Sequence, residues 1–401
     1  MAGYLFRRIL QMILVVFLSA IASYTLLSLA PGGPLSGLRQ QQQTGRFRIT
    51  EEDFARIRAS FELDLNLPVR FSRWFIGYPA GPLTIGNYEF FANYAVGCRK
   101  PLEETRLDAK GNYITVETGC KPGETVFLKD LKDRKVSKGV LFGDFGDSWQ
   151  ITRGLPVSNL LMTRLPYTIQ LAGISFLLSL LIAIPLGIYS AIKQYSRFDY
   201  VFTLLAFIGS SMPTFFFGIL MILFFSVLPN IAGSTAMPAG SAEAVRNYTI
   251  VGVGDVVAGS LVDKILHLVL PVLTLTIVGV SGYSRFIRAS MLEVLRQDYV
   301  RTARAKGLLE RFVILKHALR NALIPFVTIV VFEIPALFGG AIITESIFSW
   351  PGMGRLYIAA LGNNDYPVAM AFFFILAVLT LIATLLRDIA YTIVDPRIRF
   401  S

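Results

Sequence analysis

Charged residues are scarce in this sequence. Asp, Glu, Lys and Arg make up 16% of its 401 residues, whereas a soluble globular chain has about a quarter. Nucleotide-binding and catalytic motifs are missing as well. The sequence has no G-x-x-x-x-G-K-[ST] pattern, which excludes ATP binding through a P-loop in this chain. It has no G-x-S-x-G or H-E-x-x-H pattern either, so we expect a non-catalytic protein.

Apolar residues take the place of the missing charge. They make up 54% of the chain, and its mean hydropathy is +0.57. Apolar runs of about 20 residues predict transmembrane helices. We expect six spans, at Ile9–Ala30, Leu165–Ile192, Tyr200–Leu228, Ile265–Phe286, Ala322–Ile347 and Pro367–Ile393. The first run is longer than a signal-peptide core and has no clear cleavage site after it, which favours an uncleaved anchor.

Basic residues gather in segments that six spans would place on one side of the membrane. These are Arg7 and Arg8, Lys193 and Arg197, the segment 285–320, and Arg387, Arg397 and Arg399. The positive-inside rule makes this side cytoplasmic and puts both termini there. Topology therefore explains the net charge of +11, and no nucleic-acid partner is needed. His267 and His317 fall on opposite sides, so no metal site is expected.

The spans divide the chain into an N-terminal transmembrane helix (1–30), an extracytoplasmic insert (31–164) and a core membrane domain (165–401) with five spans. Within the insert, Thr50 is a helix N-cap candidate, followed by three acidic residues. Tyr113–Val116 and Thr125–Leu128 read as short strands with a turn between them, which makes the insert a small α+β unit.

The only two cysteines, Cys98 and Cys120, both lie in this insert. In an oxidising compartment, two cysteines in one loop favour a disulfide. Two free thiols or a metal-binding pair are the alternatives, and the absence of histidine from the insert disfavours a metal.

A short basic segment between spans four and five is the strongest functional signal. It lies in the loop 287–321, and its polar composition places it in water at the membrane surface. Gly307 is expected to end a helix there, because glycine adopts the left-handed conformation easily. The segment therefore predicts a docking helix for a soluble partner. The alternative is a solvated basic loop that only satisfies the positive-inside rule.

The segment Asp298–Gly307, followed by His317–Pro325, resembles the EAA loop of ABC-importer permeases in its peptide-transport form. The general pattern is Glu-Ala-Ala-x3-Gly followed by Leu-Pro. Here the residues are Arg301, Thr302, Ala303 and Gly307, with Leu319-Arg320 in place of Leu-Pro, departures that the dipeptide and oligopeptide branch shares. Further segments similar to that branch are Tyr4–Arg8, Arg164–Thr168, Ser211–Phe215, Phe348–Arg355 and Asp395–Arg399. The last two favour its B-type subunit.

The resemblance covers nearly all of the membrane part and fails in residues 31–144, which are longer than the family usually has. Pro31–Pro34 also lacks an acidic residue often found there, which puts any role of that acid in doubt. The implied fold is an all-α integral membrane protein with the six-helix type I importer fold and the small extracytoplasmic insert between helices 1 and 2. The implied location is the bacterial cytoplasmic (inner) membrane.

The implied function is that of a permease subunit of an ATP-driven importer for di- and oligopeptides, forming half of the pore. The implied partners are a C-type permease subunit, two P-loop ATPase subunits that bind ATP and Mg²⁺, an extracytoplasmic peptide-binding protein and the lipid bilayer. This chain itself would hold no cofactor. The residues implied in ATPase coupling are Asp298, Tyr299, Arg301, Thr302, Ala303, Lys306 and Gly307.

Two alternatives stay open. Relatives carry nickel chelates, glutathione or oligosaccharides, and a secondary transporter driven by an ion gradient is a different class. The latter predicts inverted repeats, and the two halves of this sequence show none.

Ionisable residues at membrane depth usually face a bundle interior or water, so Glu333 and Glu345 are substrate-path candidates. A structural carboxylate bonded to a hydroxyl or to a partner's base is the other interpretation, which we favour for Glu345. The remaining candidates are Ser211, Pro213, Gly339 and Gly340. Pro213 and Pro271 are expected to kink their helices.

Overall fold

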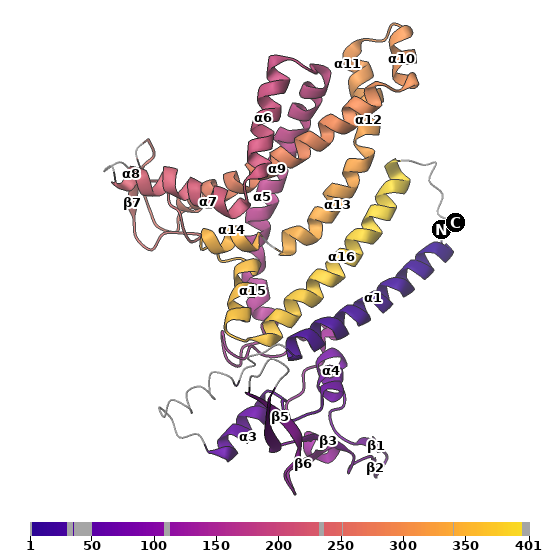
Figure 1. Ribbon diagram of the computed structural model, residues 1–401, viewed down its shortest axis with the longest axis vertical. Coiled ribbons are helices and arrows are strands. Elements are labelled where there is room, and N and C mark those ends of the chain that lie inside the picture. The colour runs from indigo at the N-terminus through magenta and orange to yellow at the C-terminus, as the bar shows by residue number, and fades with distance from the viewer. Residues whose placement is uncertain are drawn as a thin grey trace. The chain divides into compact units, whose positions relative to one another are not determined.

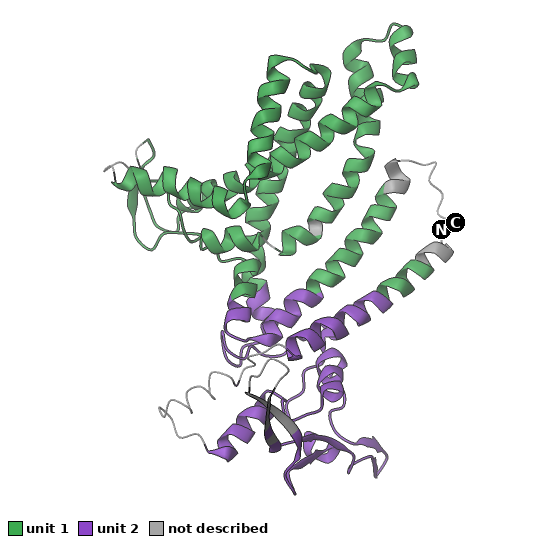
Figure 2. Ribbon diagram, viewed as in Figure 1, with its two compact units in different colours: residues 1–13, 162–358, 375–401 green, residues 14–161, 359–374 purple. Residues whose placement is uncertain are grey.

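The computed structural model describes residues 2–29, 35, 50–107, 113–231, 236–250, 252–339 and 341–394 and is mainly helical (Figure 1). The chain forms two compact units (Figure 2). Unit 1 comprises Met1–Ile13, Met162–Ile358 and Ile375–Ser401, and unit 2 comprises Leu14–Leu161 and Ala359–Phe374.

Six helical segments among the described residues are long and apolar enough to cross a membrane, as the sequence predicts. They are Phe6–Leu29, Val157–Ile192, Thr214–Ile231, Leu261–Leu295, Ile324–Ile347 and Tyr366–Ala390. The corresponding unbroken helices are α1 (Ala2–Leu29), α5 (Val157–Ile192), α9 (Leu261–Leu295) and α16 (Tyr366–Val394). The fifth span is divided into α13 (Ile324–Gly339) and α14 (Ile342–Ile347), and α15 (Met353–Gly362) follows it.

The predicted third span, Tyr200–Leu228, is wrong as a single helix. The chain forms α6 (Arg197–Ser211) and then a separate helical segment made of α7 (Thr214–Ile222), a π-helical turn (Leu223–Val227) and α8 (Leu228–Ile231). Met212 between them is extended, with φ −86° and ψ 132°. Pro213 causes the break, because proline lacks an N–H donor and keeps the residue before it out of the helical region. Pro271, by contrast, lies inside continuous α9.

The segment after α9 consists of short helical pieces in unit 1. They are α10 (Asp298–Ala305), α11 (Glu310–Phe312), a π-helical turn (Val313–Ala318) and α12 (Leu319–Ala322). A buried cluster holds this region to α5, α9 and α13. Its members are Ala191, Ile287, Met291, Ile314, Ala318, Ala322 and Phe326. The short antiparallel pair β7 (Tyr248–Ile250) and β8 (Gly254–Val256) also belongs to unit 1.

Unit 2 contains the expected mixture of helices and strands. Among its described residues, the insert contains the helices α3 (Glu51–Ser60) and α4 (Leu67–Ile76), with 3-10 turns at Leu128–Leu131 and Val140–Phe142. Thr50 caps α3 as predicted, accepting a hydrogen bond from the Asp53 N–H at 3.2 Å. Buried Leu65, Val96, Val126 and Leu131 form the core of the insert.

The strands that the structure describes in unit 2 pair as three antiparallel ribbons. These are β1 (Leu83–Ile85) with β2 (Tyr88–Phe90), β3 (Ala95–Cys98) with β6 (Thr125–Phe127), and β4 (Pro101–Leu107) with β5 (Tyr113–Cys120). The two predicted strands exist, but β5 extends beyond its predicted end at Val116 as far as Cys120. Cys98 and Cys120 form the predicted disulfide, with Cα atoms 5.7 Å apart.

Candidate functional site

Helix α10 has one buried face and one exposed face. Val300 and Ala303, three residues apart, lie on the same side of the helix and pack with Val313 in a buried cluster. Gln297 precedes the helix in an extended conformation, and Gly307 follows it with φ +76°, as the sequence predicts. Val300 and Ala303 therefore anchor the helix, and its other residues are exposed.

The exposed face of α10 carries most of the residues predicted for coupling. Asp298, Tyr299, Arg301, Thr302, Lys306 and Gly307 are all exposed. Ala303 is different, because only 6% of it is accessible, so this residue positions the helix. Among the small residues of α10, Thr302 and Ala305 are exposed, whereas Ala303 is buried.

Polar contacts fix α10 to the segment that follows it. The Arg304 guanidinium donates to the Glu310 carboxylate, with Nη2 2.7 Å from Oε1, and these hydrogen bonds hold the pKa of Glu310 below its usual value. The Asn321 side-chain amide donates to the Tyr299 hydroxyl at 3.0 Å. Asn321 belongs to the second half of the family-like motif, so the structure brings the two halves of that motif together.

An exposed apolar patch lies immediately after α10. Leu308, Leu309, Phe312 and Leu315 are each at least 40% exposed. Contiguous exposed apolar side chains beside charged ones are typical of protein–protein contact surfaces. This patch was not among the predicted site residues. The large apolar residues that directly follow Gly307 in the sequence could have indicated it.

Glu345 joins two of the segments on which the resemblance rests. Thr168 Oγ1 donates to Glu345 Oε1 at 2.8 Å and accepts from the Met353 N–H at 2.7 Å. The Arg355 N–H donates to Glu345 Oε2 at 3.0 Å, and the carboxylate is fully buried. Glu345 thus has the hydroxyl partner that the interpretation as a structural carboxylate expects, and that role stays a prediction.

The other substrate-path candidates have separate surroundings. Glu333 in α13 accepts a hydrogen bond from the Tyr283 hydroxyl of α9 at 2.5 Å. Gly339 ends α13 beside Leu376, and Gly340 lies outside the described residues. Ser211 ends α6, and its hydroxyl donates to the Phe207 carbonyl at 2.6 Å. Pro213 directly precedes α7. The structure gives each of these candidates different neighbours, and their role in a substrate path stays a prediction.

Comparison with protein families identifies the chain. Residues 183–400 match the model of the family described as "Binding-protein-dependent transport system inner membrane component". The match includes α10 and everything from the end of α5 onward. The chain belongs to this family. It is therefore a membrane component of a binding-protein-dependent importer, with the α-helical fold of these permeases.

Individual relatives agree with this assignment. The chain is 43% identical over 258 residues to "Oligopeptide transport system permease protein AppB" of Bacillus subtilis (strain 168), covering 64% of this chain and 77% of AppB. It is 37% identical over 269 residues to "Dipeptide transport system permease protein DppB" of Escherichia coli (strain K12), covering 65% and 78%. "Probable peptide ABC transporter permease protein y4tP" of Sinorhizobium fredii is 29% identical over 400 residues, covering 100% of both chains. The insert thus has a counterpart in at least one relative of this permease.

Sequence reasoning missed three buried aspartates that organise the permease. Asp199 accepts from Arg288 Nε and Nη2, both at 2.8 Å, and these hydrogen bonds hold its pKa well below the usual range. Asp263 accepts from the Tyr248 hydroxyl at 2.8 Å and from the Ala244 N–H at 2.9 Å.

The signal for these two aspartates is a repeated helix start. Each stands three residues after a serine N-cap, Ser196 or Ser260, whose hydroxyl accepts from the aspartate N–H at 3.2 Å. Asp365 has no such signal. It accepts from the backbone N–H groups of Trp149, Gln150 and Ile151 at 2.9–3.0 Å, contacts that no local pattern predicts.

Proposed function

We propose that this chain is the B-type permease subunit of an ATP-driven importer for di- and oligopeptides. The names of AppB, DppB and y4tP all refer to peptide transport, which supports the substrate class. A C-type permease subunit completes the pore, two ATPase subunits bind ATP and Mg²⁺, and an extracytoplasmic peptide-binding protein delivers the substrate. The protein lies in the bacterial cytoplasmic membrane with both termini inside. This chain contributes no catalysis, and its family argues against ion-coupled secondary transport.

Helix α10 is the lever of this mechanism. The observation that carries the assignment is its construction: Val300 and Ala303 are buried anchors, while Asp298, Tyr299 and Arg301 face outward. A partner ATPase that grips the exposed face would move α9 and α13 with it, because α10 packs against the chain that connects them. The work done is a rigid-body movement, without bond breaking in this subunit. The exposed patch Leu308–Leu315 extends the surface available to the ATPase.

The insert is assigned to the outer side of the membrane, where it contacts the binding protein or covers the mouth of the pore. Its disulfide supports an oxidising compartment. Its small core, made of Leu65, Val96, Val126 and Leu131, gives it a defined shape that a binding protein could recognise.

The coupling assignment is tested by Gly307→Val in the complete transporter. Gly307 has φ +76°, a conformation that β-branched residues adopt poorly, so valine will displace the end of α10. We expect normal membrane insertion and continued ATP hydrolysis, with peptide uptake reduced by more than about tenfold, corresponding to about 1.4 kcal/mol of lost coupling. Uptake of a labelled dipeptide and a labelled oligopeptide is measured together with ATP hydrolysis in proteoliposomes.

Gly254→Val is the matched control, because Gly254 also has a positive φ (+89°) and nothing within 4 Å of the added side-chain position. It should leave uptake and ATP hydrolysis coupled. Normal peptide uptake by Gly307→Val would refute the role of α10 in coupling ATP hydrolysis to transport. A different result is that the wild type takes up neither peptide and yet hydrolyses ATP when another substrate is delivered. That result would refute the peptide assignment alone.

A further inference from the structure

A large cavity lies within unit 2. Its volume is about 1360 Å³, and it is bounded by the end of α1, by α3 and α4, by the loop 144–150 and by the start of α16. Tyr24 and Ser28 line it from α1, Arg70 and Trp74 from α4, and Tyr366 from α16. The cavity is therefore shared between the folded insert and the ends of two membrane helices.

Two hydrogen-bond donors on α4 point to a ligand in this cavity. Arg70 Nε and Trp74 Nε1 are buried and have no hydrogen-bond acceptor among the residues that the structure describes. They are four residues apart, so both lie on the same face of α4. The Trp74 ring packs on Tyr24 with centroids 5.1 Å apart, which fixes its orientation. Leaving a buried donor without an acceptor costs about 1–3 kcal/mol, so a pair of them calls for an explanation.

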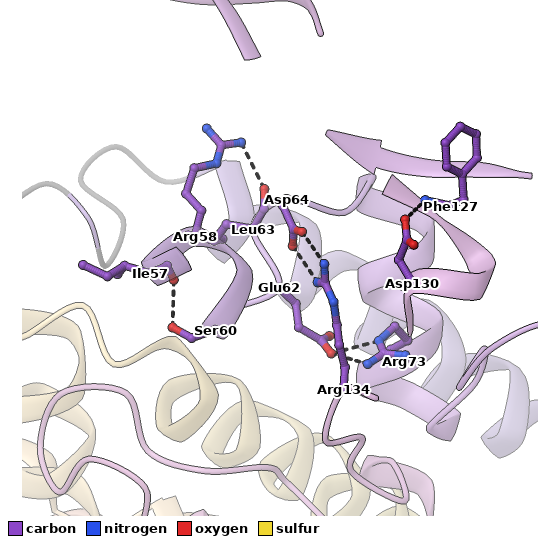
Figure 3. Close-up of polar contacts among 10 residues, drawn as sticks. All are labelled: Ile57, Arg58, Ser60, Glu62, Leu63, Asp64, Arg73, Phe127, Asp130 and Arg134. Atoms are coloured by element: carbon purple, nitrogen blue, oxygen red, sulfur yellow. Dashed lines mark hydrogen bonds and ion pairs between the residues drawn. The ribbon is translucent and has the colours of Figure 1, made fainter. Parts of the chain in front are cut away.

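The nearby carboxylates are bound to other groups, and among the described residues none of them accepts a hydrogen bond from either donor. Figure 3 shows Glu62 bound to Arg73, with Nε 2.9 Å from Oε1, and Asp64 bound to both terminal nitrogens of Arg134 at 2.9 and 2.6 Å. Asp147 accepts from Lys135 at 2.5 Å. Among the described residues, the positive charge of Arg70 therefore has no carboxylate partner in an ion pair.

The position of the cavity indicates the class of ligand. Tyr24 and Ser28 belong to the last two turns of a helix that is long enough to span a membrane. Phosphate groups of lipids lie at the ends of such helices, where tyrosine and tryptophan are also enriched. The planar guanidinium of arginine binds phosphate oxygens through paired hydrogen bonds.

We propose that this cavity binds a phosphate group, held by the Arg70 guanidinium and the Trp74 indole N–H. A phospholipid headgroup and free phosphate share this chemistry. A bound headgroup would join the insert to the membrane beside α1 and α16. The site is independent of the peptide that the importer carries.

The test uses the assembled transporter, purified in detergent and depleted of lipid. In one arm, binding of labelled inorganic phosphate is measured by equilibrium dialysis. In the other, binding of a short-chain phosphatidylglycerol is measured by native mass spectrometry. We expect saturable binding in at least one arm and at least tenfold weaker binding by Arg70→Gln in that arm. Binding in the lipid arm alone identifies a headgroup site, whereas binding in both arms shows that free phosphate suffices.

Two further variants keep the test decisive. Trp74→Phe retains the ring against Tyr24 but removes the N–H donor, and we expect binding about threefold to tenfold weaker, the effect of one lost hydrogen bond. Arg56→Gln makes the same change as Arg70→Gln on an exposed position of α3 and should bind like the wild type. The proposal is overturned by the absence of saturable binding in both arms, or by Trp74→Phe and Arg70→Gln binding as tightly as Arg56→Gln.

Discussion

Glu345 shows how two glycines make room for one buried carboxylate. A Cβ atom on Gly352 would lie 2.3 Å from Glu345 Oε1, and one on Gly354 would lie 2.6 Å from the Ile342 Cα atom. Real Cβ atoms do not approach other atoms so closely. The glycines of the Trp350–Arg355 segment are therefore required by packing, since the backbone must approach the acid to donate its N–H groups.

Gly352→Ala should accordingly destabilise the permease. The added methyl group displaces a fully buried carboxylate from its donors, and overpacking of this kind costs about 1–3 kcal/mol. We expect a lower Tm of the purified transporter and reduced uptake. Gly362→Ala is the matched control, because nothing lies within 4 Å of its added Cβ atom. Equal Tm values for the two variants would contradict this account of the carboxylate.

At the residue scale, the sequence indicates which residues are important for structure or function. It indicates less well which residues they contact. The sequence singled out Glu345 because an ionisable group at membrane depth needs a partner. Its bond to Thr168 joins residues far apart in the chain, which no local pattern encodes. Asp365 is the same case, since its donors come from the loop before α5.

At the scale of elements, membrane helices were predictable because burial in lipid demands long apolar runs. All six predicted spans overlap helical segments that are long and apolar enough to cross a membrane. Hydropathy could not indicate the break in the third span, because Pro213 ends one helix and precedes another within one apolar run. Strands were harder, because β5 and β6 each pair with an earlier strand and not with one another.

The β4–β5 ribbon offers a way to test the insert without unfolding it. Replacing residues 103–118 by a short Gly-Ser turn keeps Pro101 opposite Cys120 and leaves β3, β6 and the disulfide in place. If the insert serves the binding protein, uptake and binding-protein association should both fall at least threefold. Basal ATP hydrolysis should stay unchanged, because α10 is untouched.

Association is measured by pull-down of the binding protein, and uptake in proteoliposomes. The control changes a different ribbon without shortening it, replacing the Gly86-Asn87 turn of the β1–β2 pair by Gly-Gly, which should change neither quantity. Unchanged uptake and association after excision of the ribbon would show that this part of the insert is dispensable.

At the scale of the whole molecule, an even number of spans places both termini on one side of the membrane. The proposed orientation puts Cys98 and Cys120 on the other side, in the compartment where disulfides persist. In intact cells, a membrane-impermeant maleimide should label these cysteines only after reduction. Cys98→Ser/Cys120→Ser is the control for background labelling. Labelling before reduction would contradict the disulfide, and no labelling after reduction would contradict the orientation.

The extended residue between α6 and α7 also bears on how such a permease changes shape. Met212 belongs to neither helix, so a rotation about its backbone bonds stretches no hydrogen bond of either one. Ala341, with φ −78° and ψ 68°, is also non-helical, at the point where α14 begins. A bundle of unbroken rods has to tilt each rod as a whole, whereas a bundle with joints at these points can turn its short segments separately. The resistance to such a movement comes from side-chain packing, which a bound ATPase can exchange for contacts of its own.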